Sequence, residues 1–344
     1  MGHAGRREPV LFLGGSGQAG SGAAGLLRRW HPEVPLAIAG RDLGRAERVA
    51  GELGGATAVT VDLTRADLGL PAGQAYSAVV AAVWDSHLHG LRYAQRHQVP
   101  YLSLSSGLTD IGPEVVAGAQ RSTAAPMLLA SHWCAGALVF AVLDLAREFE
   151  RIDTIRADAL LDENDAGGPA GLADLARWGA VTSAGLQRHG GRFAWVDGTD
   201  ADVEVLTTDG RAIPGRSVPI LDVPSLALAT GASDVRFAFA IGESAGRRRG
   251  AGPSIEVRID LEGVDAGGRA LRTTRHLVHP EGQRPLTALG VALGVERLTG
   301  LRGPAVPAGI HTPEALIDPA YAAERLAEIG AGYVEGVPSA GVSG

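Results

Sequence analysis

Short, largely apolar runs alternate with segments of helical spacing along the N-terminal part of the chain. Each run has the length of a buried strand, and the runs fall at residues 10–13, 36–39, 58–61, 78–83 and 100–104. Segments of helical character separate them, at residues 23–29, 45–53 and 87–97. This alternation predicts an α/β fold with a doubly wound parallel sheet, in which ligands bind at the carboxyl ends of the strands.

The pattern changes beyond residue 150. Apolar and charged positions alternate with a period of two over residues 255–262, and apolar residues at 235, 237, 239 and 241 also share one face. This period is typical of antiparallel strands with one face in water. Residues 166–187 are predicted to be helical, and the three arginines at 247–249 are interpreted as a solvated loop, with an anion site as the less favoured alternative. A second, α+β domain with a mixed or antiparallel sheet is therefore expected.

The first apolar run ends in a cluster of glycines that opens a helix. Two registers of a dinucleotide-binding motif fit this cluster, G-x-G-x-x-G from Gly15 and G-x-x-G-x-x-G from Gly14. Glycine permits the tight turn, the close approach of a pyrophosphate and the close packing of helix on strand, while free N–H groups at the helix N-terminus bind phosphate. The predicted pyrophosphate-binding residues are Gly14, Gly15, Ser16, Gly17, Gln18, Ala19 and Gly20.

Composition excludes several classes of protein. The net charge is −7 over 344 residues, which argues against a nucleic-acid partner. All 31 basic residues are arginine, so Schiff-base lysine chemistry and a P-loop lysine are both excluded. The long apolar stretch at 126–146 contains His132 and Asp144, so a buried strand and helix are expected there and not a membrane span. The single cysteine and an N-terminus that runs into the first strand without a signal peptide favour the cytoplasm.

The residues at the strand ends resemble one family. The order Gly14-Gly15-Ser16-Gly17, Ala39-Gly40-Arg41-Asp42, Asp62 and the run at 100–105 is similar to the nucleotide-binding half of the saccharopine dehydrogenase-like family. The closing segments at 286–288 and 311–316 resemble the same family, and the middle of the chain resembles it little. The chain departs from its relatives at Ser103, where they often have aspartate, and in lacking the lysine that one branch uses as an acid or base. Saccharopine itself is therefore not the expected substrate.

This resemblance implies a domain order and a chemistry. We expect an NAD(P)-binding Rossmann domain over residues 1–130, an α+β substrate and dimerisation domain over 131–305, and C-terminal helices over 306–335 that return to the Rossmann domain. The family implies NAD(P)-linked oxidation or reduction at a carbon–nitrogen bond of a small molecule, in a homodimer.

Arg41 is the residue that bears most on the choice of cofactor. It follows Gly40 at the end of the second strand, where NAD-binding folds carry an acidic residue for the ribose. A guanidinium there pairs with the 2′-phosphate of NADP, so NADP is the predicted cofactor. NAD remains the alternative if Asp42 faces the ribose. The resemblance places Asp62 and Leu63 beside the adenine, and Asp62 is equally suited to cap the next turn.

The predicted catalytic and substrate residues follow the later strands. Residues Ala82, Val83 and Trp84 are expected to contact the cofactor, and Asp85 or His87 to face the substrate, although Asp85 is better suited to cap the next helix. No metal is expected, because on a helix the rings of His87 and His89 would point to different sides. The remaining candidates are His132 as proton donor, with a capping or core histidine as the alternative, and Ser105, Ser106 and Trp133 as substrate contacts.

These patterns predict an NADP-preferring oxidoreductase that transfers a hydride at a C=N or CH–NH bond. Reduction of C=C or C=O by the same fold is one alternative. A non-catalytic NADP sensor is another, since no acid/base pair is evident in the chain.

Overall fold

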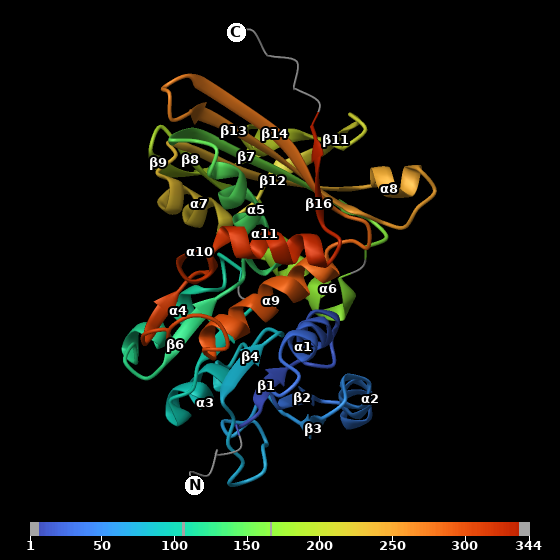
Figure 1. The fold of residues 1–344 in the computed structure, drawn as a ribbon, viewed down its shortest axis with the longest axis vertical. Coiled ribbons are helices and arrows are strands. Elements are labelled where there is room, and N and C mark those ends of the chain that lie inside the picture. The colour runs from blue at the N-terminus through green and yellow to red at the C-terminus, as the bar shows by residue number, and fades with distance from the viewer. Residues whose placement is uncertain (1–6, 105–106, 166, 337–344) are drawn as a thin grey trace. The chain divides into compact units, whose positions relative to one another are not determined.

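The computed structural model describes residues 7–104, 107–165 and 167–336. The chain divides into two compact units, each built from several segments (Figure 1). Unit 1 comprises Met1–Gly136, Gly167–Leu175 and Thr287–Ile317, and unit 2 comprises Ala137–Ala166, Ala176–Leu286 and Asp318–Gly344.

Unit 1 is built on a seven-stranded parallel sheet with the strand order β15-β6-β5-β4-β1-β2-β3. Its strands are β1 (Val10–Leu13), β2 (Leu36–Gly40), β3 (Ala56–Thr60), β4 (Ala78–Ala81), β5 (Tyr101–Ser103), β6 (Pro126–Leu129) and β15 (Gly309–His311). Its helices are α1 (Gln18–Trp30), α2 (Leu43–Leu53), α3 (His89–His97), α4 (Gly112–Gln120), η1 (Trp133–Gly136), α9 (Arg284–Leu298) and α10 (Pro313–Leu316). The predicted α/β fold class is confirmed, because the apolar runs form adjacent parallel strands.

Helix α9 packs closely because it presents glycines to the sheet. A Cβ atom on Gly294 would lie 2.6 Å from Leu102 Cδ1 and 2.8 Å from Leu128 Cδ2, and one on Gly290 would overlap the carbonyl oxygen of Ala135. Leu102 and Leu128 are fully buried on β5 and β6. The lack of a side chain at Gly294 lets α9 lie close to the sheet, and the lack of one at Gly290 lets it lie close to the backbone of Ala135.

Unit 2 is built on a nine-stranded mixed sheet. Seven strands follow the order β10-β11-β12-β7-β13-β14-β16, and β8 pairs with both β12 and β9. The strands are β7 (Arg151–Asp162), β8 (Gly185–His189), β9 (Arg192–Val196), β10 (Asp202–Leu206), β11 (Ala212–Ser217), β12 (Asp234–Gly242), β13 (Ile255–Val264), β14 (Ala270–His279) and β16 (Gly332–Glu335). The helices are α5 (Ala137–Ala146), α6 (Gly168–Val181), η2 (Gly198–Ala201), α7 (Asp222–Thr230), α8 (Ala245–Arg248) and α11 (Pro319–Glu328), of which α6 begins in unit 1.

The alternation over residues 255–262 does form a strand, but its polar face is not wholly in water. Glu256 and Arg258 are 2% and 3% exposed. Arg258 donates to Asp260 at 2.7 Å, and Glu256 accepts backbone N–H groups from Thr208 and Ala245. Expecting these two residues to be solvated was wrong, because paired charges and hydrogen-bonded carboxylates can be buried where lone ones cannot.

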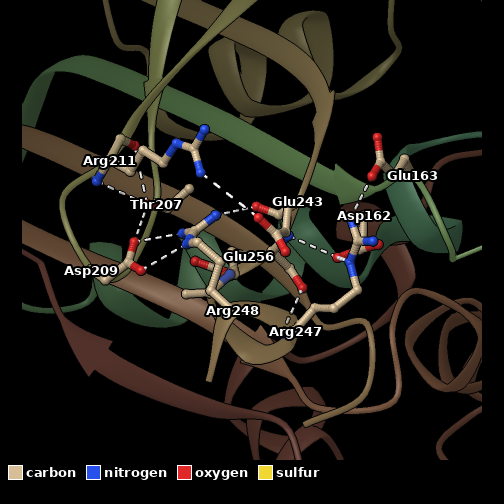
Figure 2. A network of polar contacts seen from close by, with 11 residues as sticks. Asp162, Glu163, Thr207, Asp209, Arg211, Glu243, Arg247, Arg248 and Glu256 are labelled. Carbon is tan, nitrogen blue, oxygen red and sulfur yellow. Dashed lines mark hydrogen bonds and ion pairs between the residues drawn. The ribbon is translucent and has the colours of Figure 1, made fainter. Parts of the chain in front are cut away.

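Two further expectations in unit 2 were wrong. The helix predicted over residues 166–187 ends at Val181, and Gly185–His189 forms strand β8. The arginines at 247 and 248 are not merely solvated (Figure 2): Arg247 bonds Asp162 and Glu163, and Arg248 bonds both carboxylate oxygens of Asp209. These carboxylates neutralise the two guanidinium groups, which removes the charge that an anion would need.

Candidate nucleotide-binding site

The glycine turn between β1 and α1 is fixed by its own backbone. Gly14 has φ +76°, a conformation that favours glycine, and its N–H donates to Ala39 O at 3.0 Å. Gly17 is the N-cap of α1 and its N–H donates to Gly14 O at 2.9 Å. A Cβ atom on Gly20 would lie 2.7 Å from Gly14 O. Turn, cap and close packing therefore fall on Gly14, Gly17 and Gly20, which is the register that starts at Gly14.

Other residues predicted to bind the cofactor lie in or beside this turn. A Cβ atom on Gly14 would lie 3.1 Å from both Ala82 O and Val83 Cβ, so the segment after β4 passes directly beside the turn. Gln18, the first residue of α1, lies against Gly168, where an added Cβ would be 3.4 Å from Gln18 Cδ. Gly15 is packed on Phe12, and Ala19 is partly buried. The structure thus gathers two strand ends and the start of α6 around a helix N-terminus.

The end of β2 adjoins the same turn. A Cβ atom on Gly40 would lie 3.0 Å from Ser16 Oγ, so the serine hydroxyl covers the last residue of β2. Arg41 follows directly and is exposed. Asp42 accepts the N–H of Arg45 at 3.0 Å and caps α2. One carboxylate oxygen of Asp42, the alternative ribose ligand, therefore caps helix α2, whereas Arg41 is exposed.

Asp62 makes a local turn at the end of β3. One of its carboxylate oxygens accepts the N–H of Thr64 at 2.9 Å and the hydroxyl of Thr64 at 2.7 Å. These hydrogen bonds lower the pKa of the Asp62 carboxyl below its ordinary value. The next residue, Leu63, is tied to α3 because its carbonyl lies 2.9 Å from His89 Nδ1. The geometry accords with the turn-capping alternative for Asp62 and leaves its contact with adenine a prediction.

Asp85 is an interior residue. It is 3% exposed, and its Oδ2 accepts the N–H of Gly90 at 2.6 Å at the start of α3. Its Oδ1 is buried and has no hydrogen-bond partner among the described residues. This placement matches the helix-capping alternative, in which Oδ2 accepts the hydrogen bond and Oδ1 is not used.

The two histidines near Asp85 lie together. His87 precedes α3, which begins at His89, and the two rings stack with centroids 5.3 Å apart. The statement that the rings point to different sides of a helix was wrong, because only His89 is in the helix. Among the described residues, no three His, Cys, Asp or Glu side chains gather as metal ligands would. Trp84 precedes these residues in the sequence, and 39% of its surface is exposed.

His132 lies at the end of β6 and is buried. Burial lowers the pKa of its imidazole to about 3, so the ring is neutral at physiological pH. The chain then turns in a left-handed sense, with φ +48° at Cys134 and +56° at Ala135, conformations that cost energy in residues other than glycine. Trp133 and Cys134 are buried in this segment. Ser105 and Ser106, predicted to contact the substrate, lie outside the described residues.

One buried polar cluster was not predicted. Ser103 Oγ donates to both carboxylate oxygens of Glu114, at 3.0 and 2.8 Å, and the three residues Ser103, Glu114 and Tyr101 are all buried. Burial raises the pKa of the Tyr101 phenol well above its ordinary value, and the carboxylates of Glu114 and Asp85 raise it further. The sequence signal for helix α4 is Pro113-Glu114, a proline in the first turn followed by an acid, and this helix was not predicted.

Comparison with known proteins identifies the fold. No family model and no curated protein sequence matches the chain. Among solved structures, saccharopine dehydrogenase (L-Glu forming) from Saccharomyces cerevisiae has a TM-score of 0.61 at 12% identity, covering 95% of this chain and 100% of that one. Scyllo-inositol dehydrogenase from Lactobacillus casei has a TM-score of 0.47 at 12% identity, covering 88% and 92%. Dihydrodipicolinate reductase from Paenisporosarcina sp. TG-14 has a TM-score of 0.42 at 11% identity, covering 89% and 97%.

The chain therefore has the Rossmann-type fold of the NAD(P)-dependent oxidoreductases. Of these structures, saccharopine dehydrogenase shares that fold over nearly the whole of both chains. The predicted resemblance to the saccharopine dehydrogenase-like family is confirmed for the fold. No described helix is long and apolar enough to cross a membrane.

Proposed function

We propose that the protein is an NADP-preferring oxidoreductase that transfers a hydride at a C=N or CH–NH bond of a small molecule. The observation that carries the proposal is the juxtaposition of a glycine turn at the N-terminus of α1 with an exposed arginine at the end of β2. The first suits a pyrophosphate, and the second suits the 2′-phosphate that distinguishes NADP from NAD.

The residues present fit such a cofactor. Gly17 leaves the space beside the N-terminus of α1 free of any side chain, because a Cβ there would meet only Gly14 O within 4 Å, at 3.1 Å. Arg41 would hold the 2′-phosphate, while Asp42 directs one carboxylate oxygen to the N–H of Arg45 in α2. Asp62, Leu63, Ala82, Val83 and Trp84 would line the remaining length of the cofactor. The nicotinamide supplies the hydride chemistry when it is bound.

The proton that accompanies hydride transfer is assigned to His132, with His87 and Asp85 as the other candidates. Burial holds the His132 imidazole neutral with a pKa of about 3, which makes it a weak base in the free protein, so the proposal requires that the bound substrate raises this pKa toward neutrality. Trp133, Ser105 and Ser106 are proposed to contact the substrate. We place the protein in the cytoplasm, acting on a small molecule.

A non-catalytic NADP sensor is the second candidate. The observation that favours it is the burial of two of the three proposed proton carriers, Asp85 at 3% and His132 at 5% exposure. A sensor would retain the glycine turn and Arg41 without needing either group in contact with a substrate.

Two measurements separate these functions. Isothermal titration with NADPH tests cofactor binding, and NADPH consumption with a panel of cyclic imines, ketones and enones tests chemistry. The proposal expects binding and turnover of an imine that is lowered about 10²–10⁴-fold in His132→Ala, with NADPH affinity retained. Binding without turnover of any of the three substrate classes, in either direction, would favour the sensor.

A further inference from the structure

Helix α6 is apolar in composition but has little of its surface buried. Among its 14 residues two are charged, Asp174 and Arg177. Even so, none of the residues of α6 whose burial is described, 168, 171–177 and 179–181, is buried. No other helix or strand of the described chain packs extensively against it. A helix of this composition normally buries one face against its neighbours, so α6 has apolar surface that the described chain does not cover.

One face of α6 begins at the glycine turn between β1 and α1. Gly168 lies against Gln18, the first residue of α1, since a Cβ atom on Gly168 would be 3.4 Å from Gln18 Cδ. Leu172 and Leu175 follow Gly168 at positions i+4 and i+7, so they fall on the same face of the helix, about 6 and 10 Å further along its axis. Leu172 is 58% exposed although it is one turn from this contact. The uncovered apolar face therefore starts where the pyrophosphate is proposed to bind.

The chain before and after α6 is held more firmly than the helix itself. Before the helix, Asp165 is buried, and its Oδ2 accepts the N–H of Gln283 at 2.7 Å. After the helix, Gly185 of β8 packs so closely on β11 that an added Cβ atom would lie 2.5 Å from Ser217 Cβ. A helix with few buried contacts between two fixed ends can shift without unfolding its neighbours, as segments that close over ligands do.

We propose that the N-terminal half of α6 closes over the dinucleotide bound at the glycine turn, so that Leu172 and Leu175 pack against it. The inference rests on the proposed function, because it takes the NADP site as given. The occupant is the nucleotide and not another protein, because the uncovered face starts at the site itself, where Gly168 meets Gln18. Closure gives the two leucines the flat rings of the nucleotide to pack against, and it removes water that would promote side reactions of the hydride.

Hydrogen exchange of the full chain, with and without saturating NADPH, tests the closure. The backbone amides of residues 171–175 should exchange rapidly in the free protein, because the helix has few buried contacts. With NADPH bound, they should exchange at least about 10-fold more slowly, because closure adds contacts along this half of the helix. Strand β9, in which four of the five residues are exposed, is the internal control and should exchange at the same rate in both samples.

Isothermal titration of NADPH into the same preparation separates this inference from the proposed function. If NADPH does not bind, both are overturned. If NADPH binds and the amides of residues 171–175 exchange as fast as before, the closure of α6 is overturned while the NADP site stands. Slower exchange in α6 and β9 alike would mean that NADPH stabilises the whole chain without closing α6, and it would also overturn the inference.

Two serine substitutions in the same helix test the face that closes. Leu172→Ser removes an apolar side chain from the face that begins at Gly168 and should raise the dissociation constant of NADPH about 10-fold. Val181→Ser is the matched control, because Val181 is 59% exposed, against 58% for Leu172, and lies nine residues further on, on the opposite face of the helix. It should bind NADPH as the wild type does. Neither variant should shift the midpoint of urea unfolding, since both residues are exposed. Equal NADPH affinities for the two variants would overturn the proposal.

Discussion

The glycines of the β1–α1 turn leave different amounts of room for a side chain. A Cβ on Gly20 would lie 2.7 Å from Gly14 O, and one on Gly15 would lie 2.8 Å from Phe12 O. Gly17 is less crowded, since its Cβ would meet only Gly14 O, at 3.1 Å. A substitution at Gly17 is therefore the one that separates nucleotide binding from folding.

Replacement of Gly17 by leucine should weaken NADPH binding strongly and leave the fold intact. The side chain would occupy the space at the N-terminus of α1 where the pyrophosphate is proposed to lie, and hydrogen bonds to a charged group are each worth about 1.5–3 kcal/mol. We expect affinity to fall by about 100-fold or more, measured by isothermal titration. Gly51→Leu, on α2 with open space around it, is the control. Undiminished binding to a folded Gly17→Leu variant would place the cofactor elsewhere.

The buried imidazole of His132 should make stability depend on pH. The folded state holds its pKa at about 3, whereas the ordinary value is 6.5, so the unfolded chain binds this proton first as pH falls. The contribution is fully present above about pH 6.5 and is lost progressively between there and pH 3. His132→Gln should therefore lose less stability than the wild type between pH 7.5 and about 4.5 in urea unfolding. Parallel pH profiles for the two proteins would show that the imidazole is not buried in this way.

Helix α9 depends on two glycines, of which Gly294 faces the sheet and Gly290 faces Ala135. A methyl on Gly290 would overlap the backbone of Ala135, which cannot move without disturbing the left-handed turn. A methyl on Gly294 would press on the ends of two leucine side chains, which can rotate. The two positions differ in how much their neighbours can yield.

This difference predicts a graded series of stabilities. Gly290→Ala should cost about 1–3 kcal/mol of unfolding free energy, and Gly294→Ala less. Gly51→Ala, in open space on α2, should stabilise by about 0.5–1 kcal/mol because alanine favours helix. Urea unfolding of the three variants measures the order. Equal effects at 290 and 294 would contradict the packing described for α9.

Elements with a strong local pattern could be predicted from the sequence. The strands β1, β2 and β4 are entirely buried and read as unbroken apolar runs. β15 was missed because it has three residues, none fully buried, and is stabilised by pairing with β6. β8 was mistaken for helix because tertiary pairing with β12 and β9 outweighs the local propensity.

The same distinction applies to the candidate site. The position of the glycine turn depends on neighbours in sequence and could be predicted, whereas its register could not, because two registers fit the glycines and only the backbone geometry selects the one from Gly14. The burial of Asp85 and His132 depends on elements distant in sequence, and the bond between Ser103 and Glu114 depends on the unpredicted helix α4. Their environments could not be inferred from spacing alone.

At the scale of the whole molecule, unit 1 is assembled from segments distant in the chain. β6 pairs with β15, and the buried Leu102 and Leu128 lie against Gly294 of α9. A fragment that ends at Gly136 lacks both β15 and α9. It would expose these apolar residues, which destabilises it by about 25 cal/mol for each Å² of apolar surface.

This fragment should not unfold cooperatively, whereas residues 7–136 joined by a flexible linker to residues 287–317 should regain a urea transition. Circular dichroism at increasing urea concentration compares the two proteins. A cooperative transition in the shorter fragment would mean that the C-terminal segment is dispensable for folding the nucleotide-binding unit.

The proposed preference for NADP over NAD can be tested at Arg41. Isothermal titration of NADP and NAD into the wild type, Arg41→Ala and the control Arg48→Ala, an exposed arginine further along α2, compares the two cofactors. The wild type should bind NADP more tightly than NAD. Arg41→Ala should weaken NADP by about 1.5–3 kcal/mol and NAD much less, with Arg48→Ala resembling the wild type. Equal losses for the two nucleotides, or a wild-type preference for NAD, would contradict the proposed preference for NADP.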